Sequence, residues 1–208
     1  MKMVKKRILY TGIVAVIIVF STTFAILMFL ERLDYRNYLQ GQYSKNMYEL
    51  VSSVQNIRIN LGKAAIVGSP EQSIIVFEEI FRYSATANDK LHSLPLDQSV
   101  VGDTSKFLTQ VGDFCYTLAQ SASEGKKLND KQYNLIDTLE IQSYTLQEQL
   151  NGALSDINDG KVKWGDIRKK SSGVIAKTGG DIVTQKFTGI QKQIAQYPAL
   201  IYDGPFSD

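Results

Sequence analysis

Hydrophobic positions divide the chain into one uniformly apolar segment and several amphipathic ones. Residues 8–30, "ILYTGIVAVIIVFSTTFAILMFL", contain neither a charged residue nor a proline. A helix of this length reaches about 35 Å, more than the roughly 30 Å hydrocarbon core of a bilayer. A cleavable signal peptide has a shorter apolar region and a cleavage site between small residues, which "FAILMFLERL" does not offer. The pattern therefore predicts an uncleaved transmembrane signal anchor over residues 8–30.

Beyond this segment, hydrophobic residues recur at spacings of three and four, the period of an amphipathic helix. The first stripe is a heptad seam, typical of helices packed at shallow angles, and consists of Tyr43, Met47, Leu50, Val54, Ile57, Leu61 and Ala64. The second consists of Ile74, Phe77, Ile80, Phe81 and Ala85. The third consists of Phe107, Leu108, Val111, Phe114, Cys115, Leu118 and Ala119. The fourth consists of Ile136, Leu139, Leu146, Leu150, Ala153 and Ile157.

Capping and turn residues separate these stripes. Ser69 can cap a helix that begins at Pro70, with Gln72 completing a capping box, and Asn129 and Gln132 can do the same for a later helix. The predicted helices run from the membrane span to about residue 67, from 70 to about 91, from about 101 to 122, and from about 130 to 157.

Four amphipathic helices joined by short polar loops predict an all-α fold, in which the transmembrane helix is followed by an antiparallel four-helix-type bundle over residues 31–160. No segment alternates with the period of a strand, so essentially no sheet is expected. Each stripe is a candidate cofactor groove or partner surface, but all four need burial and find it in one another. Core packing is therefore the favoured interpretation.

The character of the chain changes after residue 160. Residues 161–180 form a basic and Gly/Ser-rich connection, in which "KVKWGDIRKK" holds five basic residues and one acid. The favoured interpretation of this run is a solvated helix end, and the alternative is contact with anionic lipid or cell-wall polymer. Trp164, the only tryptophan, is expected to pack against the end of the fourth helix, with a partner contact as the alternative. Residues 181–197 predict a short helix, and residues 198–208 a linker that begins at Pro198.

The distribution of charge predicts the orientation of the chain in the membrane. Residues 1–7 form a basic flank with Lys2, Lys5, Lys6 and Arg7, whereas the remaining chain holds 19 basic and 21 acidic residues. Since segments rich in Lys and Arg stay in the cytoplasm, the N-terminus is expected inside and the bulk of the protein outside the membrane. A nearly neutral ectodomain offers no basic face, so no nucleic-acid partner is expected.

Candidate chemistry is mostly absent from the sequence. Cys115 and His92 are the only residues of their kinds, and together they do not make one of the usual zinc sites. Cys115 is expected to be a small buried side chain, and a reactive thiol is the alternative. Acidic residues are scattered, and adjacent Glu78 and Glu79 point in different directions, unlike the paired carboxyls of a glycosidase. The sequence therefore predicts no catalytic residue, metal or cofactor, with an enzyme of unrecognised type as the alternative.

Three segments resemble the YpeB family of spore germination proteins: "VGDFCYTLA", the isolated tryptophan in "KVKWGDI", and the ending "YPALIYDGPFSD". The order of anchor, helical region and ending is also similar to the N-terminal region of that family. The resemblance implies a non-catalytic membrane protein that stabilises or retains a SleB-like cortex-lytic enzyme at the inner membrane of the spore. It implies that enzyme and the membrane as partners, with peptidoglycan as a further candidate. The run "KWGDIRKK" is more basic than the family leads one to expect.

In this family the ending leads into PepSY-type domains, which this sequence does not include, so a fragment or truncated product is expected. The tentative partner or interdomain contacts are Trp164, Tyr197, Tyr202, Asp203 and Phe206. The alternative for the ending is a flexible linker of incidental composition. The main rival for the whole chain is the four-helix sensor domain of a membrane receptor, which normally has a second membrane span.

Overall fold

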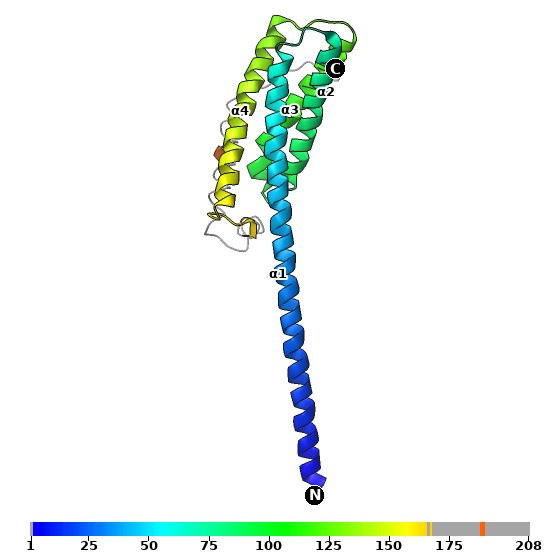
Figure 1. The fold of residues 1–208 in the computed structure, drawn as a ribbon, viewed down its shortest axis with the longest axis vertical. Helices are drawn as coiled ribbons and strands as arrows, with labels where there is room; N and C mark the ends of the chain where they lie inside the picture. The colour runs from blue at the N-terminus through cyan, green and yellow to red at the C-terminus, as the bar shows by residue number, and fades with distance from the viewer. Residues whose placement is uncertain (1, 166, 168–187, 190–208) are drawn as a thin grey trace. The chain divides into compact units, whose positions relative to one another are not determined.

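The computed structural model describes residues 2–165, 167 and 188–189, and these residues contain four α-helices and no strand (Figure 1). The helices are α1 (Lys2–Ala64), α2 (Pro70–His92), α3 (Gln98–Ser123) and α4 (Asp130–Asn158). The predicted all-α fold is confirmed. The predicted short helix and linker lie outside the described residues, except that Thr188 and Gly189 are helical.

The chain divides into two compact units, residues 1–41 and 42–208, and α1 contributes to both. From Gly12 onward α1 is the one described helix that is long and apolar enough to cross a membrane, and its most apolar window is not buried. Thr22 and Thr23 sit within this stretch, and both hydroxyls donate to the backbone carbonyl of Val19. Their polar groups are thereby satisfied within the helix, which suits an apolar surrounding.

The second unit is an antiparallel bundle of the later part of α1 with α2, α3 and α4. Figure 1 shows α1 between α4 and α2, with α3 behind it. Helices α1 and α4 are antiparallel, because Tyr48 contacts Asn158 whereas Arg58, further along α1, contacts the earlier residue Tyr144 of α4. Between α2 and α3, Gly112 permits a close approach, since a Cβ at that position would lie 3.1 Å from Cβ of Ser84.

Three of the four predicted stripes form the core. Apart from half-buried Tyr43, every residue predicted for the stripes of α1, α3 and α4 is buried. The stripe predicted for α2 is partly wrong, because Phe81 is 39% exposed and Ala85 is also exposed. The buried face is turned slightly from the predicted one and consists of Val76, Phe77, Ile80, Ser84, Ala87 and Leu91. Spacings of three and four from Phe77 to Leu91 leave Phe81 at the edge, where its ring lies 5.3 Å from that of Tyr116.

The helix boundaries follow the local capping chemistry. Asn129 and Gln132 form the predicted capping box, with both bonds at 2.9 Å. At α2, the hydroxyl of Ser69 accepts a bond from the backbone N–H of Gln72, which supplies one half of the box predicted there. α1 ends at Ala64, three residues before the predicted end, and α3 begins at Gln98, three residues before the predicted start.

We expect Leu150→Ala to destabilise the protein by about 2–5 kcal/mol, because the fully buried Leu150 would leave a cavity between α4 and its neighbours. Urea unfolding of the chain in detergent micelles measures this loss. Ile75→Ala serves as a control, since Ile75 is 58% exposed on α2 and its truncation should cost far less. Equal costs for the two substitutions would show that α4 does not pack through this stripe.

Candidate functional site

The chain returns to α1 immediately after α4. Gly160 follows the C-cap residue Asp159 and adopts a positive φ of 71°, a conformation that favours glycine and that ends α4 there. Lys161 then pairs with Asp156 at 3.2 Å and Asp159 at 3.0 Å. In the segment that follows, the side chains of Val162, Trp164 and Ile167 are buried, whereas Lys161 and Lys163 are exposed. These features direct an apolar segment back onto the bundle.

Trp164 is the centre of this returning segment. Its side chain is 0% exposed, its Nε1 donates a hydrogen bond of 2.9 Å to Oγ of Ser44, and its ring centroid lies 5.8 Å from that of Tyr43. One helical turn further along α1, the hydroxyl of Tyr48 accepts a 2.8 Å bond from Nδ2 of Asn158. The end of α4 and the segment that follows it are therefore bound to one short stretch of α1, at the start of the second unit.

The structure describes only one of the five contact residues predicted from the sequence. Trp164 packs against α1 within the core, and whether it also serves a partner stays a prediction. Tyr197, Tyr202, Asp203 and Phe206 lie outside the described residues, so their predicted roles stay predictions as well.

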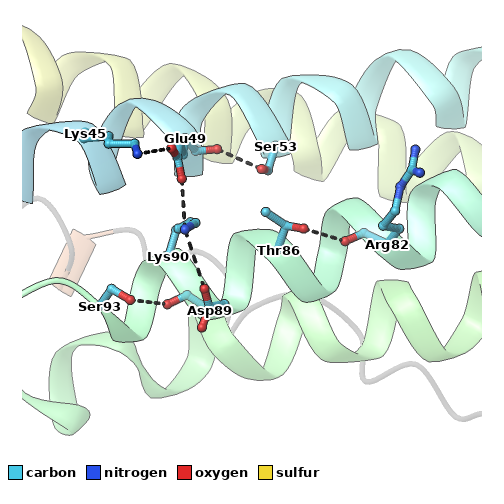
Figure 2. A network of polar contacts seen from close by, with 8 residues as sticks. All are labelled: Lys45, Glu49, Ser53, Arg82, Thr86, Asp89, Lys90 and Ser93. Atoms are coloured by element: carbon cyan, nitrogen blue, oxygen red, sulfur yellow. Dashed lines mark hydrogen bonds and ion pairs between the residues drawn. The ribbon is translucent and has the colours of Figure 1, made fainter. Parts of the chain in front are cut away.

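A polar network joins α1 to α2 on another side of the bundle (Figure 2). Glu49 accepts an ion pair of 2.9 Å from Lys90 of α2 and one of 3.7 Å from Lys45 of α1. The Lys90 hydrogen bond lowers the pKa of Glu49, and the same bond raises the pKa of Lys90. Ser53 donates to the backbone carbonyl of Glu49 at 2.8 Å. The ion pair between Glu49 and Lys90 thus fixes the register of α1 against α2.

The structure also contains a serine next to the single histidine. Nε2 of His92 lies 3.0 Å from Oγ of Ser105, and Ser105 donates its proton to Oδ1 of Asn88 at 2.7 Å. Because the serine proton is directed at Asn88, Nε2 of His92 has to donate rather than accept. A general base that activates serine needs the opposite polarity. The arrangement therefore links α2 to α3 and does not form a nucleophile–base pair.

Cys115 is buried, as predicted, and burial raises the pKa of its thiol far above the ordinary value. A thiol in this state is a poor nucleophile and a poor metal ligand. Over the part of the chain that the structure describes, no three His, Cys, Asp or Glu side chains group together as a metal site.

The predicted core stripes did not account for several large hydrophobic side chains that the structure leaves exposed. They are Tyr48 and Ile59 on α1, Ile66 just after it, and Tyr133, Ile141 and Tyr144 on α4. Arg58 of α1 lies over the ring of Tyr144, with 5.4 Å between the guanidinium carbon and the ring centroid. The available signal was that Ile59 and Ile141 are large apolar residues that fall outside the predicted core stripes.

A family model described as "YpeB N-terminal" matches residues 31–166. A protein named "Sporulation protein YpeB" from Bacillus subtilis (strain 168) is 19% identical over 166 residues, which cover 80% of this chain and 37% of that protein. A protein of the same name from Oceanobacillus iheyensis is 20% identical over 183 residues, covering 88% of this chain and 41% of that protein. The chain thus spans less than half the length of these relatives, and no solved structure matches it.

We expect Ser44→Ala to destabilise the bundle by about 1–3 kcal/mol, because the buried indole N–H of Trp164 would lose its acceptor. Trp164→Phe removes that donor, so Ser44→Ala should cost much less when it is made in a Trp164→Phe background. Urea unfolding of the four proteins of this double-mutant cycle measures the coupling. Ser52→Ala, at an exposed position of the same helix, is the control. Strictly additive effects would show that the bond contributes nothing.

The Glu49–Lys90 pair predicts a pH dependence of stability. Because the pKa of Glu49 is lowered in the folded protein, its contribution is fully present above the unfolded-state pKa and disappears as the pH falls through the folded-state pKa. Glu49→Gln should therefore reduce stability at neutral pH and lose this effect on acidification. Urea unfolding at successively lower pH measures the difference, with Glu78→Gln on the exposed side of α2 as the control. A difference that persists in acid would contradict the ion pair.

Proposed function

Since this chain belongs to the YpeB N-terminal family, we propose that it is a membrane-anchored spore germination protein that retains a SleB-like cortex-lytic enzyme in the dormant spore. The observation that carries the proposal is the extent of the family match, which covers residues 31–166. That range holds the part of α1 that enters the bundle and all of α2, α3 and α4, and it ends just beyond Trp164. It therefore includes the fold that would present a partner surface.

The proposed location follows from the N-terminal part of α1. Its apolar stretch is a candidate membrane span, and the basic flank of residues 1–7 precedes it. The positive-inside rule then favours an N-terminus in the cytoplasm and a bundle outside the inner membrane, on the side of the cortex. A protein held there is placed to keep a cortex-lytic enzyme close to its substrate.

A role in retention rather than cleavage agrees with the chemistry of the described residues. His92 faces Ser105 with the polarity of a donor, and Cys115 is buried with a raised pKa. By contrast, the described bundle exposes tyrosine and isoleucine side chains on α1 and α4, and the half-buried Arg58 lies over the ring of Tyr144. Tyrosine and arginine are enriched at binding surfaces. We therefore propose a non-catalytic role.

In a strain that lacks the gene for this chain, we expect dormant spores to contain little or none of the cortex-lytic enzyme. Immunoblots of spore membrane fractions measure its amount, and spores that lack the enzyme should be slow to lose their cortex. Restoring the gene should restore the enzyme, and an unrelated protein of the same membrane, probed in parallel, should not change. A normal amount of the lytic enzyme in the deletion strain would contradict the proposed function.

A further inference from the structure

A groove lies along the surface of α1 where the apolar stretch gives way to charged residues. It has a volume of about 920 Å³, and the described residues that line it all belong to the first unit of the chain. Its N-terminal end is lined by Ala25, Met28 and Phe29, whereas its other end is lined by charged residues and tyrosines. The groove is therefore apolar at one end and polar at the other.

The apolar end belongs to the candidate membrane span. Its three lining residues fall within the uncharged run of residues 8–30. In a bilayer this run lies among acyl chains, and the residues just beyond it lie at the level of the headgroups. A second groove is entirely within the run and is lined by Ala15, Val16, Val19, Phe20 and Thr23, none of them charged. Of these two grooves, only the first offers a phospholipid a place for both an acyl chain and a headgroup.

Three charged side chains, Glu31, Arg32 and Asp34, line the polar end of the groove. All three are exposed, and none has an ion pair or a hydrogen-bond partner among the described residues. Tyr35 also lines the groove and is 60% exposed. It follows Glu31 by four positions and Arg32 by three, so it neighbours both on the helix surface. The polar end thus presents one cation and two carboxylates beside an exposed tyrosine.

The balance of these charges decides which headgroup fits. A headgroup with only a negative charge would be attracted by Arg32 but repelled by Glu31 and Asp34. Arg36 lies one turn beyond Arg32 and outside the groove lining, and with it the charges of residues 31–36 cancel. A zwitterionic headgroup matches this pattern, because its phosphate accepts from a guanidinium while its ammonium donates to carboxylates. A primary ammonium has three N–H donors for this purpose, whereas a trimethylated one has none.

We propose that this groove binds one phospholipid with an ethanolamine headgroup, in the leaflet at the C-terminal end of the span. The phosphate pairs with Arg32, and Glu31 and Asp34, which are neighbours three positions apart, share the ammonium. Tyr35 covers the headgroup, and an acyl chain lies along the apolar end of the groove. The proposal rests on insertion of the candidate span into a membrane and is independent of any partnership with a lytic enzyme.

Native mass spectrometry tests the proposal on the full chain, released from nanodiscs that contain equal amounts of phosphatidylethanolamine, phosphatidylcholine and phosphatidylglycerol with identical acyl chains. We expect the wild type to retain phosphatidylethanolamine preferentially. Arg32→Gln should reduce the amount retained about tenfold, because a charge-assisted contact with the phosphate is lost. Glu31→Gln combined with Asp34→Asn should abolish the preference over phosphatidylcholine, whose headgroup has no N–H to donate.

Two control variants remove the same charges elsewhere. Arg36→Gln removes a positive charge one turn from Arg32 and outside the groove lining, and Glu78→Gln removes a carboxylate on the exposed side of α2. Both should retain the lipid as the wild type does. Circular dichroism checks that each variant stays helical, and the carboxylate variant is informative even if Arg32→Gln does not fold.

The proposal is overturned if the wild type retains the three lipids equally, prefers phosphatidylglycerol, or does not distinguish phosphatidylethanolamine from phosphatidylcholine. It is also overturned if Arg36→Gln reduces retention as much as Arg32→Gln does, since the groove would then not be the site. Each of these results leaves the proposed function standing, because the lytic enzyme is measured separately in spores. If the chain does not enter nanodiscs at all, the lipid site and the membrane-anchored role both fall.

Discussion

One helix has to satisfy two different surroundings, and the architecture depends on how α1 does so. Around residues 12–30 every residue is exposed, and so apolar a surface suits lipid rather than water around the helix. From Met47 onward the same helix buries one stripe against other helices and leaves the rest for water. The apolar residues thus change from covering the whole circumference to covering one side. That change marks the passage from the candidate membrane span to the part of α1 that belongs to the bundle.

The bundle has then to be closed at the end where α1 enters it. Loops join α1 to α2, α2 to α3 and α3 to α4, but no loop joins the final helix to the first. Trp164 makes this connection by filling the space beside Tyr43 and donating to Ser44. The bond between Asn158 and Tyr48 adds a second tie one turn away. The core of the bundle is thereby completed by a residue that lies beyond the last helix.

The helices could be predicted from the sequence because the periodicity that identifies them is local. The prediction of buried residues failed where packing between helices decides which side chain is buried. The heptads of α1, α3 and α4 identify core residues such as Leu50, Phe114 and Leu150 directly. On α2, Phe81 looks like a better core residue than Ser84, yet Ser84 is buried because Gly112 of α3 brings the two helices close at that point. Ser84, Thr104 and Ser143 are buried hydroxyls that have no hydrogen-bond partner among the described residues, and no apolar pattern predicts their burial. The exposed contacts between distant residues, such as Arg58 with Tyr144, depend on helix register and could not be predicted either.

The contact between Trp164 and Ser44 also has a consequence for the order in which the protein folds. The two residues are 120 positions apart in the sequence, so the bond closes a loop that contains almost the whole bundle. Closing so long a loop is entropically costly until the intervening helices have paired. Neighbouring helices can associate as the chain emerges, whereas this contact has to wait until residue 164 has been synthesised. Ser44 is synthesised early, but its hydroxyl accepts the hydrogen bond from Trp164 only after residue 164 has been made. The end of the nascent bundle at Ser44 therefore stays unclosed until synthesis has passed α4.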